Sequence, residues 1–283
     1  MTGSDMTIGR VFGIEVRASR SWLFVLAFVT LTMVSQLERA HPAWGQPVAI
    51  AAGVVMALLF FGSVVVHELA HCLVARRYGI QARSISLNFF GGLSWLSRQA
   101  VRPGEEFAFS IAGPAANVVL GLVGVGLGLL LAGQAEVVSV VAMRTGYVNL
   151  ILAAFNLVPG APLDGGRVLR AAVWRATGSY ERGTLISSVV GQAVGALVMM
   201  VGLAVTFSGD LTGLLVGLVG YYLLSRARAS LGEVALRRAL EGLTVRNLWL
   251  DSLPPIERST TLTEFLRQLA PSPTADPHFM VVD

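Results

Sequence analysis

Long apolar runs alternate with short polar segments along this 283-residue chain. A helix needs roughly 20 apolar residues to cross the hydrocarbon core of a bilayer, so the pattern predicts an all-α polytopic membrane protein. About six transmembrane helices are expected, at residues 21–37, 47–75, 106–133, 139–158, 185–207 and 211–225. The sixth run is short and interrupted by three glycines, so whether it fully spans stays open.

A different pattern separates the second and third spans. Residues 84–96 are apolar but alternate as strands do, with Gly91 and Gly92 near the centre, and they are too few to span. Non-helical backbone at membrane depth needs protein or water around its polar groups. We therefore expect a membrane re-entrant β-hairpin at about 83–97, beside a hydrated site. Residues 1–20 form a mixed, partly strand-like segment.

Composition and charge exclude a soluble globule and orient the chain. Only 13% of the residues are charged, against about 25% in soluble domains. All 21 basic residues are arginines, and all but Arg39 and Arg144 fall on one side when the N-terminus is placed inside. The positive-inside rule then predicts a multi-pass protein of the inner or plasma membrane, with segment 1–20 and the C-terminal tail in the cytoplasm. No cleavable signal peptide is expected. The single cysteine, Cys72, excludes a disulfide framework.

The second span carries the chemistry. Its sequence HELAH at 67–71 places His67 and His71 four residues apart, on one helix face, where both imidazoles can bind one metal ion. Glu68 is the next residue after His67 and lies about 100° around the helix axis from it, where its carboxylate can reach a metal-bound water. Placing ionisable side chains inside an apolar span costs free energy, so such residues usually indicate a functional site. The spacing therefore predicts a catalytic metal centre.

Zinc in a catalytic site takes three protein ligands and leaves one position open. Among the remaining carboxylates near the cytoplasmic membrane edge, Asp164 stands out, because prolines and glycines on both sides open the backbone there. Asp164 is the candidate third ligand; the alternative is a surface aspartate in a polar turn.

Three motifs in order resemble those of the site-2 proteases, which are intramembrane zinc metalloproteases. They are HELAH at 67–71, GPAAN at 113–117 and NLVPGAPLDGG at 156–166, and the resemblance covers about residues 8–230. It implies a transmembrane metalloprotease domain at 21–230. It also implies that His67, His71 and Asp164 hold one zinc ion per subunit, with Glu68 as the general base.

The resemblance implies further roles near the site. Asn117 would face the substrate or stabilise the oxyanion, with an interhelical hydrogen bond as the alternative. Gly91 and Gly92 would belong to a re-entrant β-loop whose strand edge captures an extended substrate. Asn156 is either a substrate contact or the cap of its helix.

The tail at 243–283 resembles the opening half of a CBS module, which is found in one bacterial branch of the family. The Gly-rich hairpin and second helix with which that module continues are absent from these residues, so the segment is either truncated or degenerate, and its nucleotide binding stays open. A homodimer through this segment is a further hypothesis.

Together these features predict a zinc metalloendopeptidase that cuts a peptide bond in or near a transmembrane segment of a membrane protein. Its substrate would be, for example, a membrane-tethered regulator, cut in regulated intramembrane proteolysis. Its other partner is the lipid bilayer, and no direct nucleic-acid partner is expected. The alternatives are a membrane metal-ion carrier or sensor and a catalytically silent scaffold.

Overall fold

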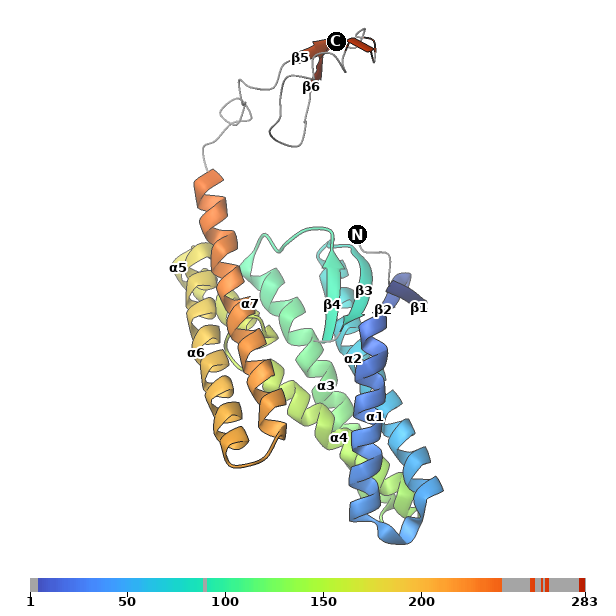
Figure 1. The fold of residues 1–283 in the computed structure, drawn as a ribbon. Coiled ribbons are helices and arrows are strands. Elements are labelled where there is room, and N and C mark those ends of the chain that lie inside the picture. Colours follow the sequence, from blue (N-terminus) through green and yellow to red (C-terminus); the bar gives the residue numbers. More distant parts are fainter. Residues whose placement is uncertain are drawn as a thin grey trace. The chain divides into compact units, whose positions relative to one another are not determined.

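The structure, a computed structural model, describes residues 5–88, 91–240, 255–257, 261, 263–264 and 280–282. The chain divides into two units, Met1–Val234 and Ala235–Asp283. In the first unit, the sheet lies toward one end of the helices, and the α1–α2 and α6–α7 connections lie at the other (Figure 1).

Five of the described helices are long and apolar enough to cross a membrane. This confirms the prediction of a polytopic helical membrane protein. They are α1 (Arg20–Ala40), α2 (Gln46–Arg77), α3 (Pro103–Leu131), α4 (Glu136–Asn156) and α6 (Tyr180–Phe207). The sixth predicted segment lies in α7 (Thr212–Leu240), which is not among these five. Its crossing stays a prediction.

Local sequence sets several helix boundaries. Pro103 stands at the start of α3, where its missing N–H is not needed, and Glu105 and Glu106 in the first turn suit the positive end of the helix. The Ser179 hydroxyl accepts a hydrogen bond from the Arg182 amide at 3.2 Å and caps α6. A short 3₁₀ turn (Pro42–Trp44) joins α1 to α2.

A four-stranded sheet joins the N-terminal segment to the predicted hairpin. The strands are β1 (Asp5–Val11), β2 (Ile14–Ser19), β3 (Ala82–Asn88) and β4 (Gly91–Leu96), in the order β1-β2-β3-β4. The hairpin of β3 and β4 is antiparallel, as predicted, whereas β2 and β3 run parallel. The sequence did not predict this parallel pairing, because α1 and α2 separate the two strands in the chain.

The sheet packs on the half of α2 that carries the HELAH motif. Ile14 and Val16 of β2 and Ile85 of β3 form a buried cluster with Leu69 and Cys72 of α2. Leu69 and Cys72 therefore anchor the HELAH-bearing part of α2 to the sheet. Cys72 is fully buried there, on a different face from the histidines, as the helical spacing predicts.

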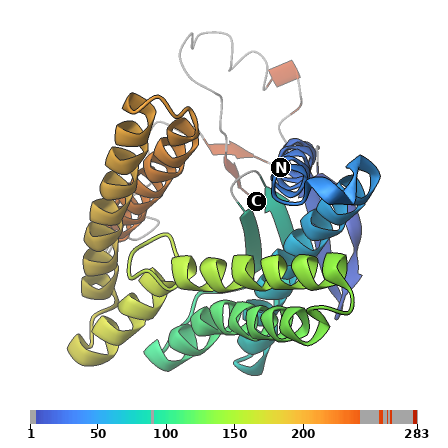
Figure 2. The same cartoon turned by 90° about the horizontal axis from the view of Figure 1, so that it is seen from below.

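Helix α4 packs closely alongside α3 (Figure 2). A Cβ atom at Gly124 would lie 2.8 Å from the Gly146 Cα, so the two backbones touch where neither residue has a side chain. Close approach through small residues is the usual way in which helices associate inside a membrane.

The segment after α4 contains a helix that the sequence analysis did not predict. α5 (Asp164–Thr177) follows a short irregular turn and ends before Gly178, whose φ of 71° suits glycine. The turn is fastened to α6 by Ser187. Its carbonyl accepts from the Ala161 amide at 3.0 Å, and its hydroxyl donates to the Gly166 carbonyl at 2.7 Å. These two bonds hold the start of α5 in place.

The described part of the second unit includes two short parallel strands, β5 (Pro255–Glu257) and β6 (Met280–Val282). Most of the predicted CBS-like segment at 243–283 lies outside the described residues. The CBS-like assignment of 243–283 stays a prediction.

Candidate metal centre

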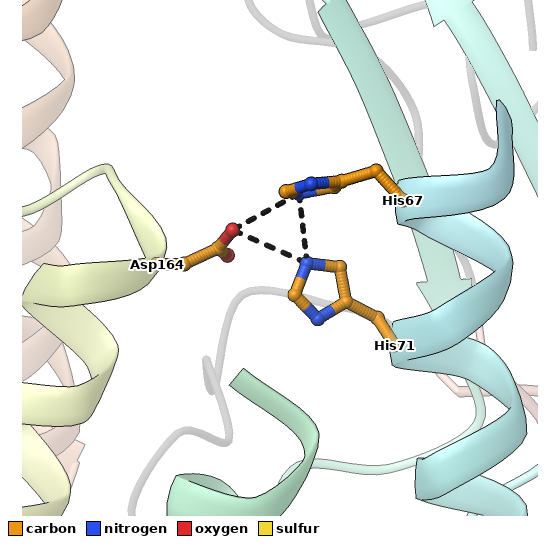
Figure 3. A group of neighbouring side chains, drawn as sticks. All are labelled: His67, His71 and Asp164. Atoms are coloured by element: carbon orange, nitrogen blue, oxygen red, sulfur yellow. Dashed lines mark hydrogen bonds and ion pairs between the residues drawn. The ribbon is translucent and has the colours of Figure 1, made fainter. Parts of the chain in front are cut away.

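Three side chains converge where α2 faces the first turn of α5. His67 and His71 lie one turn apart on α2, and Asp164 is the first residue of α5. Asp164 Oδ2 lies 3.1 Å from His67 Nε2 and 3.2 Å from His71 Nε2, and the two Nε2 atoms are 3.1 Å apart. Figure 3 shows the three side chains pointing toward one another. Among the described residues, this is the one group of three His, Cys, Asp or Glu side chains placed to share a metal ion.

The surroundings of the two imidazoles determine which nitrogen carries the proton. His67 Nδ1 lies 2.7 Å from Asn117 Oδ1, and His71 Nδ1 lies 2.5 Å from the carbonyl oxygen of Phe109. Both oxygens can only accept, so each Nδ1–H donates. A neutral imidazole then has its lone pair on Nε2, the atom that faces Asp164.

The arrangement therefore brings three lone-pair atoms together in a largely buried place. The side chains of His67, His71 and Asp164 are only 8%, 6% and 13% exposed. Such atoms repel one another unless a cation lies between them. Ligand atoms bound to a tetrahedral zinc ion at about 2.0–2.1 Å are about 3.3 Å apart, close to the separations here. Two imidazole nitrogens and one carboxylate oxygen are also a ligand set that zinc takes in catalytic sites, so these residues fit the ion.

Sequence comparison places this site among known proteins. The model of peptidase family M50 matches residues 55–145 and 131–202, together about half of the chain. A protein of Synechocystis sp. that is named as a zinc metalloprotease is 36% identical over 99% of this chain and 73% of its own length. The chain belongs to peptidase family M50.

A further relative and a solved structure agree with this assignment. A protein of Mycobacterium tuberculosis, also named as a zinc metalloprotease, is 33% identical over 84% of this chain and 61% of its own length. The solved site-2 protease of Methanocaldococcus jannaschii superposes with a TM-score of 0.54 over 80% of this chain and 95% of its own length. At 24% identity, that structure shows a shared fold. Family, relatives and apolar helices together indicate a multi-pass membrane zinc metalloprotease.

The other predicted site residues of this M50 protein differ in how they lie relative to His67, His71 and Asp164. Glu68 follows His67 on α2 and is half-buried. Asn117 lies behind His67, fully buried, with its side-chain oxygen facing Nδ1 and its nitrogen donating to Asn149 Oδ1 at 3.1 Å. This placement favours the alternative of an interhelical hydrogen bond over direct contact with a substrate.

Gly91, Gly92 and Asn156 are not part of the cluster of His67, His71 and Asp164. Gly91 pairs with Asn88 and Gly92 with Leu87 in the β3–β4 hairpin. Asn156 is the last residue of α4 and is half-buried. Their roles toward a substrate stay predictions.

The sequence analysis did not single out three residues that support the site. Asn149 is 1% exposed and contacts Asn117. Glu106 of α3 is 2% exposed and accepts from Arg170 of α5 through one carboxylate oxygen. An amide or a carboxylate within a predicted span is a signal that could have drawn attention to Asn149 and Glu106. Arg170 was counted only as a cytoplasmic charge.

Proposed function

We propose that this protein is an intramembrane zinc endopeptidase in which His67, His71 and Asp164 bind one zinc ion and Glu68 transfers the proton. The observation that carries the proposal is the convergence of three lone-pair atoms between α2 and α5. Membership of family M50 and the metalloprotease names of its relatives support it.

The residues divide the chemistry of peptide hydrolysis between them. A zinc ion, when bound, supplies Lewis-acid polarisation of the scissile carbonyl and of the attacking water. Glu68 accepts the proton that this water releases as its oxygen attacks the carbonyl carbon. Glu68 then returns the proton to the leaving amine nitrogen as the C–N bond breaks. The largely buried setting limits competition from bulk water for the ligands.

The sheet supports the proposal that the substrate is bound as an extended strand. β4, which contains Gly91 and Gly92, stands at the end of the strand order and pairs with β3 on one side. A strand edge can capture an extended peptide by main-chain hydrogen bonds. Asn156 would contact the same substrate from the end of α4.

The biological part of the proposal is regulated proteolysis of a membrane-tethered protein. The enzyme would lie in the inner or plasma membrane, with both termini and the active site toward the cytoplasm. The tail at 243–283 would act as a partial CBS-like segment, through which two copies pair. Light scattering in detergent tests the pairing: a monomer both with and without the tail contradicts it.

The decisive experiment separates proton transfer from metal binding. The full chain is reconstituted in liposomes with a membrane protein substrate, and cleavage and zinc content are measured together. Glu68→Gln should lower the cleavage rate about 10²- to 10⁴-fold with zinc content unchanged, because the amide cannot accept the proton. Asp164→Asn should lower both.

A matched control variant and a measurement of zinc flux complete this experiment. Glu38→Gln changes an exposed glutamate on α1 and should leave both readouts at wild-type values. Wild-type cleavage by Glu68→Gln with full zinc content contradicts the proposal. Zinc flux into the liposomes, equal in wild type and Glu68→Gln, would instead identify an ion carrier.

A further inference from the structure

A chain of buried amides connects His67 to the middle of α4. Asn117 Oδ1 lies 2.7 Å from His67 Nδ1, and Asn117 Nδ2 donates to Asn149 Oδ1 at 3.1 Å. Asn149 Nδ2 in turn donates to the Thr145 carbonyl, one turn earlier on α4, at 2.9 Å. Asn117 and Asn149 are 0% and 1% exposed, so water does not compete for these bonds.

The direction of every bond in this relay follows from its last acceptor. The Thr145 carbonyl can only accept, so the nitrogen of the Asn149 amide must face it. The Asn149 oxygen is then turned toward Asn117 and requires a donor. Asn117 must therefore direct its nitrogen toward Asn149 and its oxygen toward His67. His67 Nδ1 must carry the hydrogen, and the lone pair lies on Nε2, facing Asp164.

The second histidine does not depend on this relay. His71 Nδ1 donates directly to the Phe109 carbonyl of α3, a main-chain group that cannot turn over. The Asn117 side chain, by contrast, can rotate about its last bond and exchange its oxygen and nitrogen. Its contact with Asn149 is what opposes that exchange.

We propose that Asn149 is a positioning residue for the metal ligand His67, which it orients through Asn117. The inference rests on the proposed function, in which His67 binds zinc through Nε2. Without the Asn149 oxygen, the Asn117 nitrogen has no acceptor on α4 and turns toward His67. His67 Nδ1 then accepts a hydrogen bond, the proton moves to Nε2, and the position that faces Asp164 is blocked. Groups that orient a metal-binding histidine typically change metal affinity by about 10- to 100-fold.

The experiment measures zinc affinity by chelator competition on the full chain in detergent, together with the visible absorption spectrum after Co²⁺ substitution. Asn149→Leu, similar in size but without an acceptor, should weaken zinc binding about 10- to 100-fold and change the Co²⁺ spectrum. Asn149→Asp should restore most of the affinity. The aspartate keeps a carboxyl oxygen at the position of the Asn149 Oδ1 atom, and this oxygen can still accept the hydrogen bond from Asn117 Nδ2.

Ser139→Ala is the matched control for loosened helix packing. The Ser139 hydroxyl is buried in the same α3–α4 interface and donates to the Gly128 carbonyl at 2.7 Å, without contact to the relay. It should leave zinc affinity and the Co²⁺ spectrum unchanged. Equal losses in Ser139→Ala and Asn149→Leu would overturn the inference, because they would indicate a general packing effect.

Two further outcomes keep this inference separate from the proposed function. Wild-type zinc affinity in Asp164→Asn would contradict the ligand set itself. Loss of binding in Asp164→Asn, with wild-type affinity and spectrum in Asn149→Leu, would overturn the role of Asn149 alone. If Asn149→Leu does not fold, the ¹⁵N resonances of histidine in the metal-stripped wild-type protein show which nitrogen of His67 carries the hydrogen. A His67 that carries its hydrogen on Nε2 would overturn the relay.

Discussion

Gly113 shows at the scale of single residues how little space the candidate site leaves. It belongs to the GPAAN motif on α3 and faces the two histidines of α2. A Cβ atom on Gly113 would lie 2.6 Å from His67 Nε2 and closer still to His71 Nε2. The missing side chain therefore allows the two imidazoles to converge.

Gly113→Ala should accordingly abolish zinc binding while leaving the protein folded. The methyl group would occupy the space of the Nε2 atoms, and contacts below 3.0 Å force neighbouring atoms to move. Zinc content of the purified variant measures the effect. Gly126→Ala, on the same helix with open space around it, is the control and should bind zinc normally. A Gly113→Ala protein with wild-type zinc affinity would show that the site is looser than described.

At the scale of elements, the position of Asp164 depends on how α5 is attached to α3. Arg170 Nε donates to Glu106 Oε1 at 2.8 Å, and the Arg167 guanidinium lies 4.8 Å from the centre of the Phe109 ring. The carbonyl of the same Phe109 accepts from His71. One turn of α3 thus contacts both the helix that carries Asp164 and a histidine.

Arg170→Met should destabilise this attachment by about 3–5 kcal/mol, because it leaves the Glu106 carboxylate buried without its partner. Denaturant unfolding in detergent measures the loss, and zinc affinity should fall with it as Asp164 shifts. Arg175→Met is the control, since Arg175 is exposed on the same helix. The double variant Glu106→Leu and Arg170→Met should regain much of the stability. If Arg170→Met is as stable as the wild type, the ion pair between Arg170 and Glu106 does not attach α5 to α3.

At the scale of the whole molecule, the alternation of the helices predicts which loops face which side of the membrane. The loop before α2 contacts the start of α4, where Trp44 Nε1 donates to Glu136 Oε1 at 3.1 Å. This contact places the α1–α2 loop beside the start of α4, away from the sheet (Figure 1). The positive-inside rule predicts that the sheet end faces the cytoplasm.

Cysteine labelling can test this orientation, because the native Cys72 is fully buried. In intact cells, a membrane-impermeant maleimide should label Gln134→Cys in the loop between α3 and α4. Val101→Cys, an exposed position between β4 and α3, should react only after permeabilisation. The wild-type chain should stay unlabelled. The reverse labelling pattern would mean that the protein is inserted the other way round.

Much of the candidate site could be proposed from the sequence because its strongest signals are local. The spacing of His67 and His71 implies a shared helix face, and the apolar residues around them imply a membrane setting. Asp164 stood out through the prolines and glycines near it. The supporting contacts of Asn149 with Asn117, and of Arg170 with Glu106, join residues 32 and 64 positions apart. No local pattern could pair them.

By itself, the sequence determined the apolar spans, the β-hairpin at about 83–97 and the HELAH face, since helix and strand periodicities depend on neighbouring residues. Only the tertiary structure decided that Asp164 opens a separate helix and meets histidines 93 and 97 positions earlier. It also decided that β2 pairs with β3 and that Asn117 turns toward α4. These features depend on how segments that are distant in the chain pack against one another. Gly113 lets α3 approach the two histidines closely, and the buried amides of Asn117 and Asn149 must find their hydrogen-bond partners on neighbouring helices.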